Sequence, residues 1–378
     1  MAKYRFGDIC KVLNGRAYKQ NELLASGKYP ILRVGNFFSS DRWYYSDMEL
    51  PEDKYCDYED LLFAWSASFG PKIWDGEKVI YHYHIWKLIP NDDIADKWYL
   101  YYWLRHSVNR LTAGTHGSVM AHMTKGDMEN QSIELPSLQT QRKISSILRT
   151  IDEKIHNNVA INNNLEQQAQ AIFANEFLSL DTLPEGWKQA SLIDIADYLN
   201  GLAMQKYRPT ADETGIPVLK IKELRQGCCD DNSELCSPSI KSEYIIRDGD
   251  VIFSWSGSLL VDFWCGGICG LNQHLFKVTS NKYNKWFYYA WTKHHLDRFI
   301  AVAVDKATTM GHIKRDELSK AEVLIPNEAD YKRIETLLQP IYDLIIANRI
   351  ENKKLAETRD FLLPRLISGE LDVSDIDL

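Results

Sequence analysis

Two histidines, His82 and His84, are the first residues whose types and spacing suggest chemistry. Imidazole is a common zinc ligand, so this pair could hold a metal ion in a hydrolase, with His122 as a further candidate. A similar segment occurs 190 residues later, where Asn272 stands in place of His82. A site that needs both histidines would therefore exist in only one half of the chain.

Other catalytic signatures are absent from the sequence. The seven cysteines lack the C-x2-C spacing of a structural zinc site, and their odd number in a chain without an apolar leader favours reduced thiols. There is no G-x-x-x-x-G-K-[ST] phosphate loop and no G-x-S-x-G elbow, and residues 266–270 do not fit the dinucleotide-binding fingerprint. We therefore expect any catalysis to be carried out by partner proteins.

A repeated helical pattern dominates the elements that would position a site. In residues 139–178, apolar or Asn residues alternate at spacings of four and three, which is typical of a coiled-coil seam. The same pattern recurs at residue numbers that are 190 higher, except that Arg359 stands in the place of Ala169. The recurring seam positions are Ile144, Leu148, Ile151, Ile155, Asn158, Asn162 and Leu165, and then Ile334, Leu338, Ile341, Ile345, Asn348, Asn352 and Leu355. We predict two long helices that pair with each other or with helices of a partner; two ordinary amphipathic helices are the plainer alternative.

The segments between these helices also occur twice. Residues 60–68 (DLLFAWSAS) match residues 250–258 (DVIFSWSGS), and both predict a buried strand that runs into a turn of small residues. We expect Trp65 and Trp255 to belong to the core. The repeat predicts the order mixed α/β domain, long helix, mixed α/β domain, long helix.

Length and composition limit the possible classes of protein. A chain of 378 residues suggests two to three domains. The net charge of −8 argues weakly against tight nucleic-acid binding by this chain alone, although it leaves room for basic patches. The sequence has no run of 18 apolar residues and no apolar signal core, so we expect a cytoplasmic protein without a membrane span.

Several short motifs accompany the repeat. They are Leu183-Pro184-Glu185-Gly186-Trp187 at the entry to the second domain, Leu135-Pro136 and Ile325-Pro326 before the long helices, and the tail LPRLISGEL at residues 363–371. With the duplicated domain-and-helix order, they make the whole chain resemble the specificity subunits of type I restriction–modification systems.

This resemblance implies an α+β fold with two target recognition domains that have mixed α/β cores and are separated by an antiparallel coiled coil of the two long helices. Each domain would read one half of a split target in the major groove of double-stranded DNA. Two methylation subunits would dock on the helices, and restriction subunits would join them. S-adenosylmethionine, ATP and Mg²⁺ would be bound by those partners, with no cofactor in this chain. The Asn-Pro-Pro-Tyr or Asp-Pro-Pro-Tyr run of an adenine methyltransferase is absent.

The expected segments are recognition domains at residues 1–136 and 181–326, spacer helices at residues 137–180 and 327–371, and a tail at residues 372–378. We expect Pro364 and Gly369 to stop the second helix. An antiparallel pair with a pseudo-two-fold axis should bring Asn158 to Asn348 near the crossing point. A helix of about 38 residues spans about 57 Å, and one DNA turn about 34 Å, so helix length should set the unread spacer.

Candidate DNA contacts are side chains that donate or accept hydrogen bonds on predicted loops. In the first domain they are Arg16, Tyr18, Lys19, Arg33, Asn36, Ser66, Ser68, His116, Ser118, His122 and Lys125. In the second domain they are Gln205, Lys206, Tyr207, Arg208, Lys220, Lys222, Ser256, Ser258, Asn272, Gln273, Lys306, Thr308, Thr309, His312, Lys314 and Arg315. The alternative function is a coiled-coil scaffold or adaptor that binds protein and no DNA, and its main support is the negative charge and the paired helices.

Overall fold

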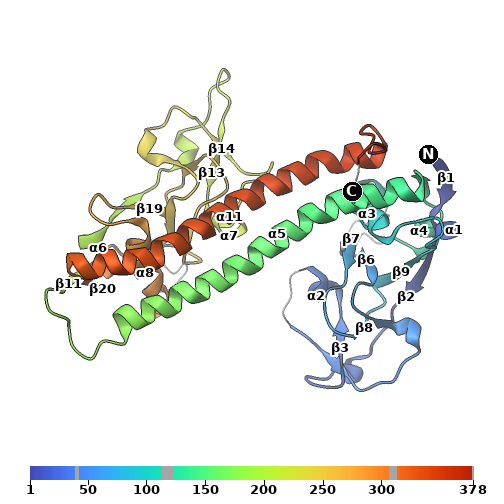
Figure 1. Cartoon of the computed structure of the whole chain (residues 1–378), viewed down its shortest axis with the longest axis horizontal. Coiled ribbons are helices and arrows are strands. Elements are labelled where there is room, and N and C mark those ends of the chain that lie inside the picture. The colour runs from blue at the N-terminus through green and yellow to red at the C-terminus, as the bar shows by residue number, and fades with distance from the viewer. Residues whose placement is uncertain (39–41, 113–122, 306–312, 377–378) are drawn as a thin grey trace. The chain divides into compact units, whose positions relative to one another are not determined.

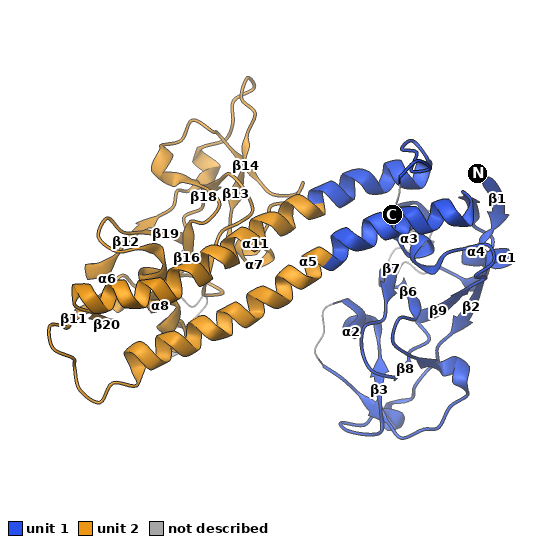
Figure 2. Cartoon of the chain, in the orientation of Figure 1, with its two compact units in different colours: residues 1–153, 357–378 blue, residues 154–356 orange. Residues whose placement is uncertain are grey.

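The chain divides into two compact units, coloured separately in Figure 2. The computed structural model describes residues 1–38, 42–112, 123–305 and 313–376. Unit 1 comprises residues 1–153 and 357–378, and unit 2 comprises residues 154–356. Because this division cuts both long helices, each helix contributes to both units. The segment boundaries expected from the sequence remain predictions.

The described residues of unit 1 form three small sheets, and several of their strands are labelled in Figure 1. Strands β1 and β10 form an antiparallel pair, and a second, antiparallel sheet has the order β2-β9-β6-β7. The third sheet has the order β4-β3-β8-β5, with β3 and β8 parallel. The strands are β1 (Ala2–Arg5), β2 (Cys10–Asn14), β3 (Tyr29–Leu32), β4 (Tyr45–Ser46), β5 (Tyr55–Cys56), β6 (Leu61–Ser66), β7 (Ser68–Ile73), β8 (Val79–Tyr81), β9 (Ile85–Pro90) and β10 (Ser132–Leu135).

Unit 2 repeats this topology strand for strand. Its sheets have the orders β11-β20, β12-β19-β16-β17 and β14-β13-β18-β15, and β13 and β18 are again the parallel pair. The strands are β11 (Lys188–Ser191), β12 (Asp197–Asn200), β13 (Ile216–Leu219), β14 (Leu235–Cys236), β15 (Ile245–Ile246), β16 (Val251–Ser254), β17 (Leu260–Phe263), β18 (Cys269–Leu271), β19 (Leu275–Thr279) and β20 (Glu322–Ile325).

Short helices connect these strands in both units. Unit 1 has α1 (Phe6–Ile9), α2 (Val34–Phe38), α3 (Lys97–Thr112), α4 (Lys125–Glu129) and the 3₁₀ turns η1 (Gln20–Glu22) and η2 (Glu52–Lys54). Unit 2 has α6 (Leu192–Ile195), α7 (Ile221–Gln226), α8 (Lys285–His294), α9 (Leu296–Asp305), α10 (Asp316–Ser319) and the 3₁₀ turns η4 (Met204–Lys206) and η5 (Ser242–Tyr244). One helix of unit 1, α3, thus corresponds to the consecutive pair α8 and α9 in unit 2.

The two long helices are α5 (Leu138–Phe173), extended by the π-helical turn η3 (Ala174–Leu178), and α11 (Glu328–Ser368). Repeat-related residues cap their first turns, because Ser137 Oγ accepts from the Thr140 amide (3.2 Å) and Asn327 Oδ1 accepts from the Asp330 amide (2.9 Å). Such a cap satisfies a helix donor that would otherwise have no partner.

The expectation that Pro364 stops the second helix is wrong, because α11 continues through this residue to Ser368. The helix ends only at Gly369, whose φ of 76° lies in the left-handed region that glycine tolerates. A proline costs the helix one hydrogen bond. Burial of Leu363, Leu366 and Ile367 in the core of unit 1 offsets that cost.

The predicted seam residues serve the cores of the units as well as the helix pair. Ile144 and Leu148 belong to the core of unit 1, beside the aromatic residues of α3. Ile334, Leu338 and Ile345 belong to the core of unit 2, against which Leu165 and Ile341 also pack. Each fully buried Leu or Ile stabilises its unit by about 1.5–3 kcal/mol. The long helices are therefore integral parts of both units.

Within unit 2, asparagine side chains join α5 to α11. Asn158 Nδ2 donates to Asn352 Oδ1 and Asn348 Nδ2 donates to Asn162 Oδ1, both at 2.8 Å. The two residue numbers in each pair add to the same total, so the helices run antiparallel. The prediction that Asn158 meets Asn348 is wrong, since the crossing point lies between the two pairs and each asparagine faces the other seam asparagine of the opposite helix. Supercoiling of the pair remains a prediction.

Candidate nucleic-acid interface

A three-residue turn organises the candidate site in each unit. It follows the parallel strand β8 in unit 1 (residues 82–84) and β18 in unit 2 (residues 272–274), and we call it the central turn. In unit 1 the amide of His82 donates to the Leu32 carbonyl oxygen (2.9 Å), and the amide of Tyr83 donates to the Arg16 carbonyl oxygen (3.0 Å). The central turn thus brings together a residue after β2 and the end of β3.

The same hydrogen bonds recur in unit 2. The amide of Asn272 donates to the Leu219 carbonyl oxygen (3.2 Å), and the amide of Gln273 donates to the Leu202 carbonyl oxygen (2.9 Å). A glycine precedes each of the two acceptor residues, Arg16 and Leu202. A Cβ on Gly15 or Gly201 would collide with carbonyl oxygens of the preceding strand, β8 or β18, and of the central turn. This close approach of two backbones explains why glycine recurs directly after β2 and β12.

A β-hairpin tip packs beside each central turn. In unit 1 the tip is residues 66–68, and the amide of Trp65 donates to the His84 carbonyl oxygen (3.1 Å). In unit 2 the tip is residues 256–258, and the amide of Trp255 donates to the His274 carbonyl oxygen (3.4 Å). Both tips turn in the left-handed region, at Ala67 (φ 65°) and Gly257 (φ 67°). The repeated small-residue motif therefore produces the same turn twice.

The tips expose only one of their two predicted serines. Ser66 and Ser256 are buried, whereas Ser68 and Ser258 are exposed. Ser256 Oγ lies 3.2 Å from His274 Nδ1, which holds the hairpin tip against the central turn. Trp65 and Trp255 are half-buried and pack against the two main cores. Ser68 and Ser258 are thus the serines positioned for contact with a ligand.

Unit 1 gathers aromatic and cationic side chains around its central turn. Arg16 forms two hydrogen bonds with the carboxylate of Glu22 (3.0 and 2.8 Å) and lies over the Tyr18 ring, which stacks on His82. Burial, with a smaller contribution from the nearby His84 and Arg33 charges, lowers the pKa of His82 to about 4. His82 is therefore neutral at pH 7 and adds no positive charge to the site.

Unit 2 carries a different set of side chains on the same backbone. Asn272 is buried and its Oδ1 accepts from the His274 amide (3.3 Å), so this side chain stabilises the central turn. Gln273 Nε2 lies 3.4 Å from His274 Nε2, and Gln273 Oε1 has no hydrogen-bond partner in the described part of the chain. The central turn of unit 2 thus contains amide side chains where unit 1 has a histidine and a tyrosine.

Several predicted cations of unit 2 are held by carboxylates. Arg208 and Lys220 both pair with Glu234, and Lys222 pairs with Asp230 (3.1 Å). Arg315 donates to the Tyr198 carbonyl oxygen (3.4 Å), while Lys314 is exposed. The residues Gln205, Lys206 and Tyr207 are exposed beside Arg208. Arg208, Lys220 and Lys222 are therefore partly neutralised before any DNA is bound.

Three further predicted contacts belong to unit 1, and the others lie outside the described residues. Lys125, in α4, pairs with Glu129 (3.4 Å), Lys19 is exposed, and Asn36 Nδ2 donates to the Arg42 carbonyl oxygen (2.9 Å). The residues outside the described part are His116, Ser118, His122, Lys306, Thr308, Thr309 and His312.

Sequence reasoning missed four residues beside these sites, Arg42, Tyr44, Tyr83 and Glu234. Tyr44 and Glu234 occupy equivalent positions, because their carbonyl oxygens accept from the amides of Ile31 (2.8 Å) and Val218 (2.7 Å) in the matching strands β3 and β13. Each residue directly precedes the strand that pairs with β3 or β13, so the strand pairing shows that they are equivalent. Strand pairing is not visible in a single sequence. Their side chains share no chemistry, so no motif marked them.

One recurring pair of residues proves to be structural. Lys87 pairs with Asp60 (2.6 Å), and at the equivalent positions Lys277 pairs with Asp250 (2.8 Å). Each lysine also donates to a backbone carbonyl oxygen, that of Tyr55 (3.2 Å) or Ile245 (3.3 Å). These interactions tie neighbouring sheets together within each unit. Their recurrence reflects the shared fold.

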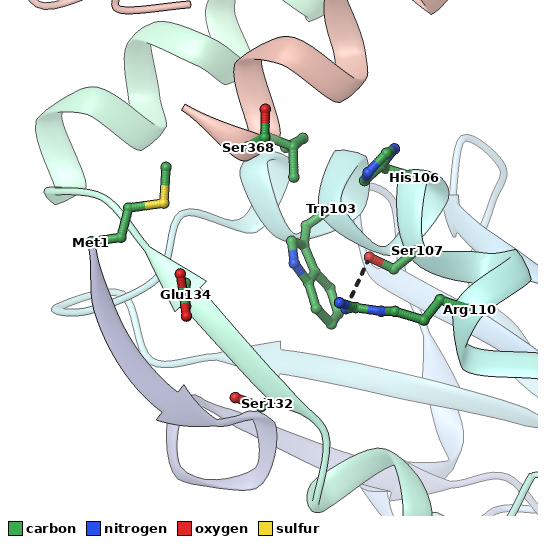
Figure 3. A pocket seen from close by; sticks show the side chains of 9 residues that line it. Met1, Trp103, His106, Ser107, Arg110, Ser132, Glu134 and Ser368 are labelled. Carbon is green, nitrogen blue, oxygen red and sulfur yellow. Dashed lines mark hydrogen bonds between the residues drawn. The ribbon is translucent and has the colours of Figure 1, made fainter. Parts of the chain in front are cut away.

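A separate cavity of about 430 Å³ opens in unit 1, lined by residues of α3, β10 and the end of α11 (Figure 3). Arg110 lies over the Trp103 ring and donates to Ser107 Oγ (3.5 Å) beside it. None of the predicted DNA contacts that the structure describes lines this cavity.

In the described ranges, no three His, Cys, Asp or Glu side chains are grouped to hold a metal ion. No helix among the described residues has the length and apolar character needed to cross a membrane.

The fold and the paired sites define a class of protein: a duplicated recognition scaffold in which one backbone arrangement displays two sets of side chains. The family described as type I restriction modification DNA specificity domain matches residues 1–167 and 184–357. The chain therefore belongs to this family of type I restriction–modification specificity subunits. These subunits are non-catalytic, and catalysis resides on the modification and restriction subunits of the same systems.

Individual relatives agree with this assignment. The chain is 25% identical over 316 residues to the type I restriction enzyme MjaIX specificity subunit of Methanocaldococcus jannaschii, covering 76% of this chain and 72% of that protein. It is 22% identical over 349 residues to the MjaVIII specificity subunit of the same organism, covering 84% and 80%. The fold is similar to the crystal structure of the type I restriction-modification system S subunit from M. genitalium, with a TM-score of 0.62, 13% identity and coverage of 97% and 95%.

Proposed function

We propose that this chain reads a bipartite DNA sequence, one half with each unit, and directs the methylation and restriction subunits of a type I complex to it. The observation that carries the proposal is the duplicated central turn. The same backbone hydrogen bonds support His82-Tyr83-His84 in unit 1 and Asn272-Gln273-His274 in unit 2. One scaffold with two sets of donors and acceptors is suited to two different half-sites.

The two-fold repeat also accounts for a split target. Dimeric DNA-binding proteins present two identical readers, which makes their operators palindromic. Here the two readers belong to one chain and differ in sequence, so the half-sites are free to differ. A protein that acts on genomic DNA in this way would work in the cytoplasm.

Docking of partners is the second part of the proposal. Two methylation subunits would bind the long helices, whose outer surfaces expose Val159, Ile161, Leu337 and Leu344. Restriction subunits would then join the complex. These partners would supply S-adenosylmethionine, ATP and Mg²⁺. Binding of a methylation subunit there would remove these exposed apolar side chains from water.

A map of modified adenines in the host genome, with and without this chain, tests the function directly. We expect a bipartite motif with a fixed unread gap, and we expect its modification to disappear when the chain is deleted. If no motif depended on the chain in an otherwise active system, the alternative of a scaffold that binds no DNA would be favoured. Salt-dependent DNA binding by the chain together with its methyltransferase would separate the two functions further.

A further inference from the structure

Two arginines of unit 1 share one aromatic ring close to the central turn. The guanidinium carbons of Arg33 and Arg42 lie 5.0 and 5.1 Å from the centre of the Tyr44 ring. Arg33 follows Leu32, whose carbonyl oxygen accepts from the amide of His82. Within the described ranges Arg33 makes no ion pair with a carboxylate. Two positive charges are thus held at the edge of the predicted DNA-contacting surface.

Unit 2 carries a negatively charged side chain in the place of this aromatic ring. Glu234 stands where unit 1 has Tyr44, because each backbone carbonyl accepts from the matching amide of β3 or β13. Lys220 stands where unit 1 has Arg33, at the end of the matching strand, and pairs with Glu234. Arg208 pairs with the other oxygen of the same carboxylate (3.1 Å). A carboxylate thus replaces the aromatic ring between two cations.

We propose that Arg33, held with Arg42 against Tyr44, binds a phosphate of the DNA backbone, and that Glu234 weakens phosphate binding at the equivalent place in unit 2. The proposal rests on the function proposed above and adds that the two units contribute unequally to the electrostatic part of DNA binding. A negatively charged group beside Arg33 is stabilised by its positive charge to a greater extent than a neutral base edge is. In unit 2, Glu234 already supplies that negative charge.

The test uses the full chain assembled with its methyltransferase partner and a duplex that carries the mapped target. Binding constants are measured over a range of salt concentrations for Arg33→Gln, Tyr44→Glu and the unit 2 counterparts Lys220→Gln and Glu234→Tyr. Each phosphate contact contributes about 0.9 to the slope of log K against log salt. We expect Arg33→Gln to reduce the magnitude of this slope by about that amount and to weaken binding to all sequences alike. Tyr44→Glu should act in the same direction.

The unit 2 variants should behave differently. Lys220→Gln should change the slope by less than half as much, and Glu234→Tyr should increase its magnitude by freeing Lys220 and Arg208. Arg33→Lys keeps the charge and should preserve most of the slope. Lys11→Gln, at the far end of β2 from Arg16, is the control for net charge and should leave the slope unchanged.

Three results would overturn the proposal. They are an unchanged slope in Arg33→Gln, a loss of selectivity at one base pair with the slope unchanged, and an equal effect of Lys11→Gln. The second result would make Arg33 a base contact. Absence of sequence-selective binding by the unmodified complex would instead overturn the proposed function, so the two failures are distinguishable. Unfolding temperatures and assembly with the methyltransferase show that each variant is folded.

Discussion

At the scale of single residues, the two units place different chemistry on one backbone arrangement. His82 and Asn272 occupy the same position in the central turn, and the amide of each donates to the strand that precedes α2 or α7. The backbone bonds that hold the turn to its neighbouring strands do not depend on these side chains. His82 Nδ1 and Asn272 Oδ1 both accept from the amide two residues later, so two different side chains fit the same turn. Differences in DNA sequence preference are therefore expected to arise from substitution without a change of fold.

The lowered pKa of His82 predicts a pH dependence of stability. Its pKa is about 4 in the folded chain and about 6.5 in an unfolded chain. Between these values the unfolded chain binds a proton that the folded chain does not, so the stabilisation is complete above about pH 6.5 and is lost as the pH falls towards 4. His82→Asn, which introduces the residue of unit 2, should reduce the fall in unfolding temperature across this window.

The control for this prediction is His156→Asn, which changes an exposed histidine on α5. Its unfolding temperature should follow that of the unchanged chain at every pH. Parallel curves for His82→Asn and the unchanged chain would show that His82 contributes nothing to acid sensitivity.

At the scale of secondary-structure elements, buried amides define how α5 and α11 pair. Asn162 and Asn348 are both buried, and Asn162 Nδ2 also donates to the Ile345 carbonyl oxygen (3.2 Å). Because an unpaired buried amide is costly, only one register satisfies all of these groups. The polar seam positions thus oppose sliding of one helix along the other, which apolar residues alone would permit.

Replacing one partner of the asparagine pair should be more harmful than replacing both. Asn162→Leu leaves Asn348 Nδ2 buried without its acceptor, and we expect a loss of about 1–3 kcal/mol in the free energy of unfolding. Asn162→Leu combined with Asn348→Leu should recover most of that loss. Urea unfolding of the single and double variants measures the coupling.

The neighbouring Asn163 provides a matched control, since its side chain is exposed on the same helix. Asn163→Leu should alter the free energy of unfolding by no more than about 0.5 kcal/mol. Equal effects at positions 162 and 163 would show that the buried hydrogen bond is not responsible.

The lengths of the long helices lead to a prediction about the target. One additional heptad in both α5 and α11 lengthens each by about 10 Å, which corresponds to about three base pairs of DNA at about 3.4 Å each. If helix length sets the unread spacer, the modified motif should gain a gap of about that size, or recognition should be abolished. Mapping of modified adenines measures the gap, and an unchanged spacer would refute the idea.

A heptad inserted in only one helix is the appropriate comparison. An insertion between a unit and these asparagines in one helix alone would shift Asn158 and Asn162 relative to Asn352 and Asn348, so that the two pairs could not form while the cores stay intact. We expect this variant to lose DNA recognition, because the helix pair could not satisfy its buried amides.

At the scale of the whole molecule, the chain consists of two units with the same sheet orders, and both long helices contribute to each unit. Each main core accordingly contains residues from α5 and α11. The units are therefore unsuited to being cut out at a single point in the chain. Exchange of recognition domains should succeed where it leaves both helices intact.

Replacing residues 1–136 with the corresponding domain of another specificity subunit should change one half of the modified motif and leave the other half and the gap unaltered. The reciprocal replacement of residues 181–326 should change the other half only. Sequencing of modified adenines in strains that carry each hybrid would test this. A hybrid that altered both halves would show that recognition is not divided between the two domains.

Local and repeating features of this protein were predictable from its sequence. The heptad spacing predicted long helices, and α5 and α11 span 36 and 41 residues. The repeat and its motifs identified the family, because periodicity and order along the chain are written directly in the sequence. The sequence predicts the central turn only in part, since it indicates Asn272 and Gln273 as contacts but His82 and His84 as metal ligands.

Tertiary structure alone decided the relationships between distant segments. The pairing of Asn158 with Asn352, the burial of Ser66 beside an exposed Ser68, and the equivalence of Tyr44 and Glu234 all depend on which strands and helices meet. A strand register or a helix crossing is set by packing over the whole core, in which a shift of one residue reverses the face that a side chain occupies. The charge that each unit offers to DNA follows from these contacts, because a carboxylate neutralises a cation only where the fold brings the two together.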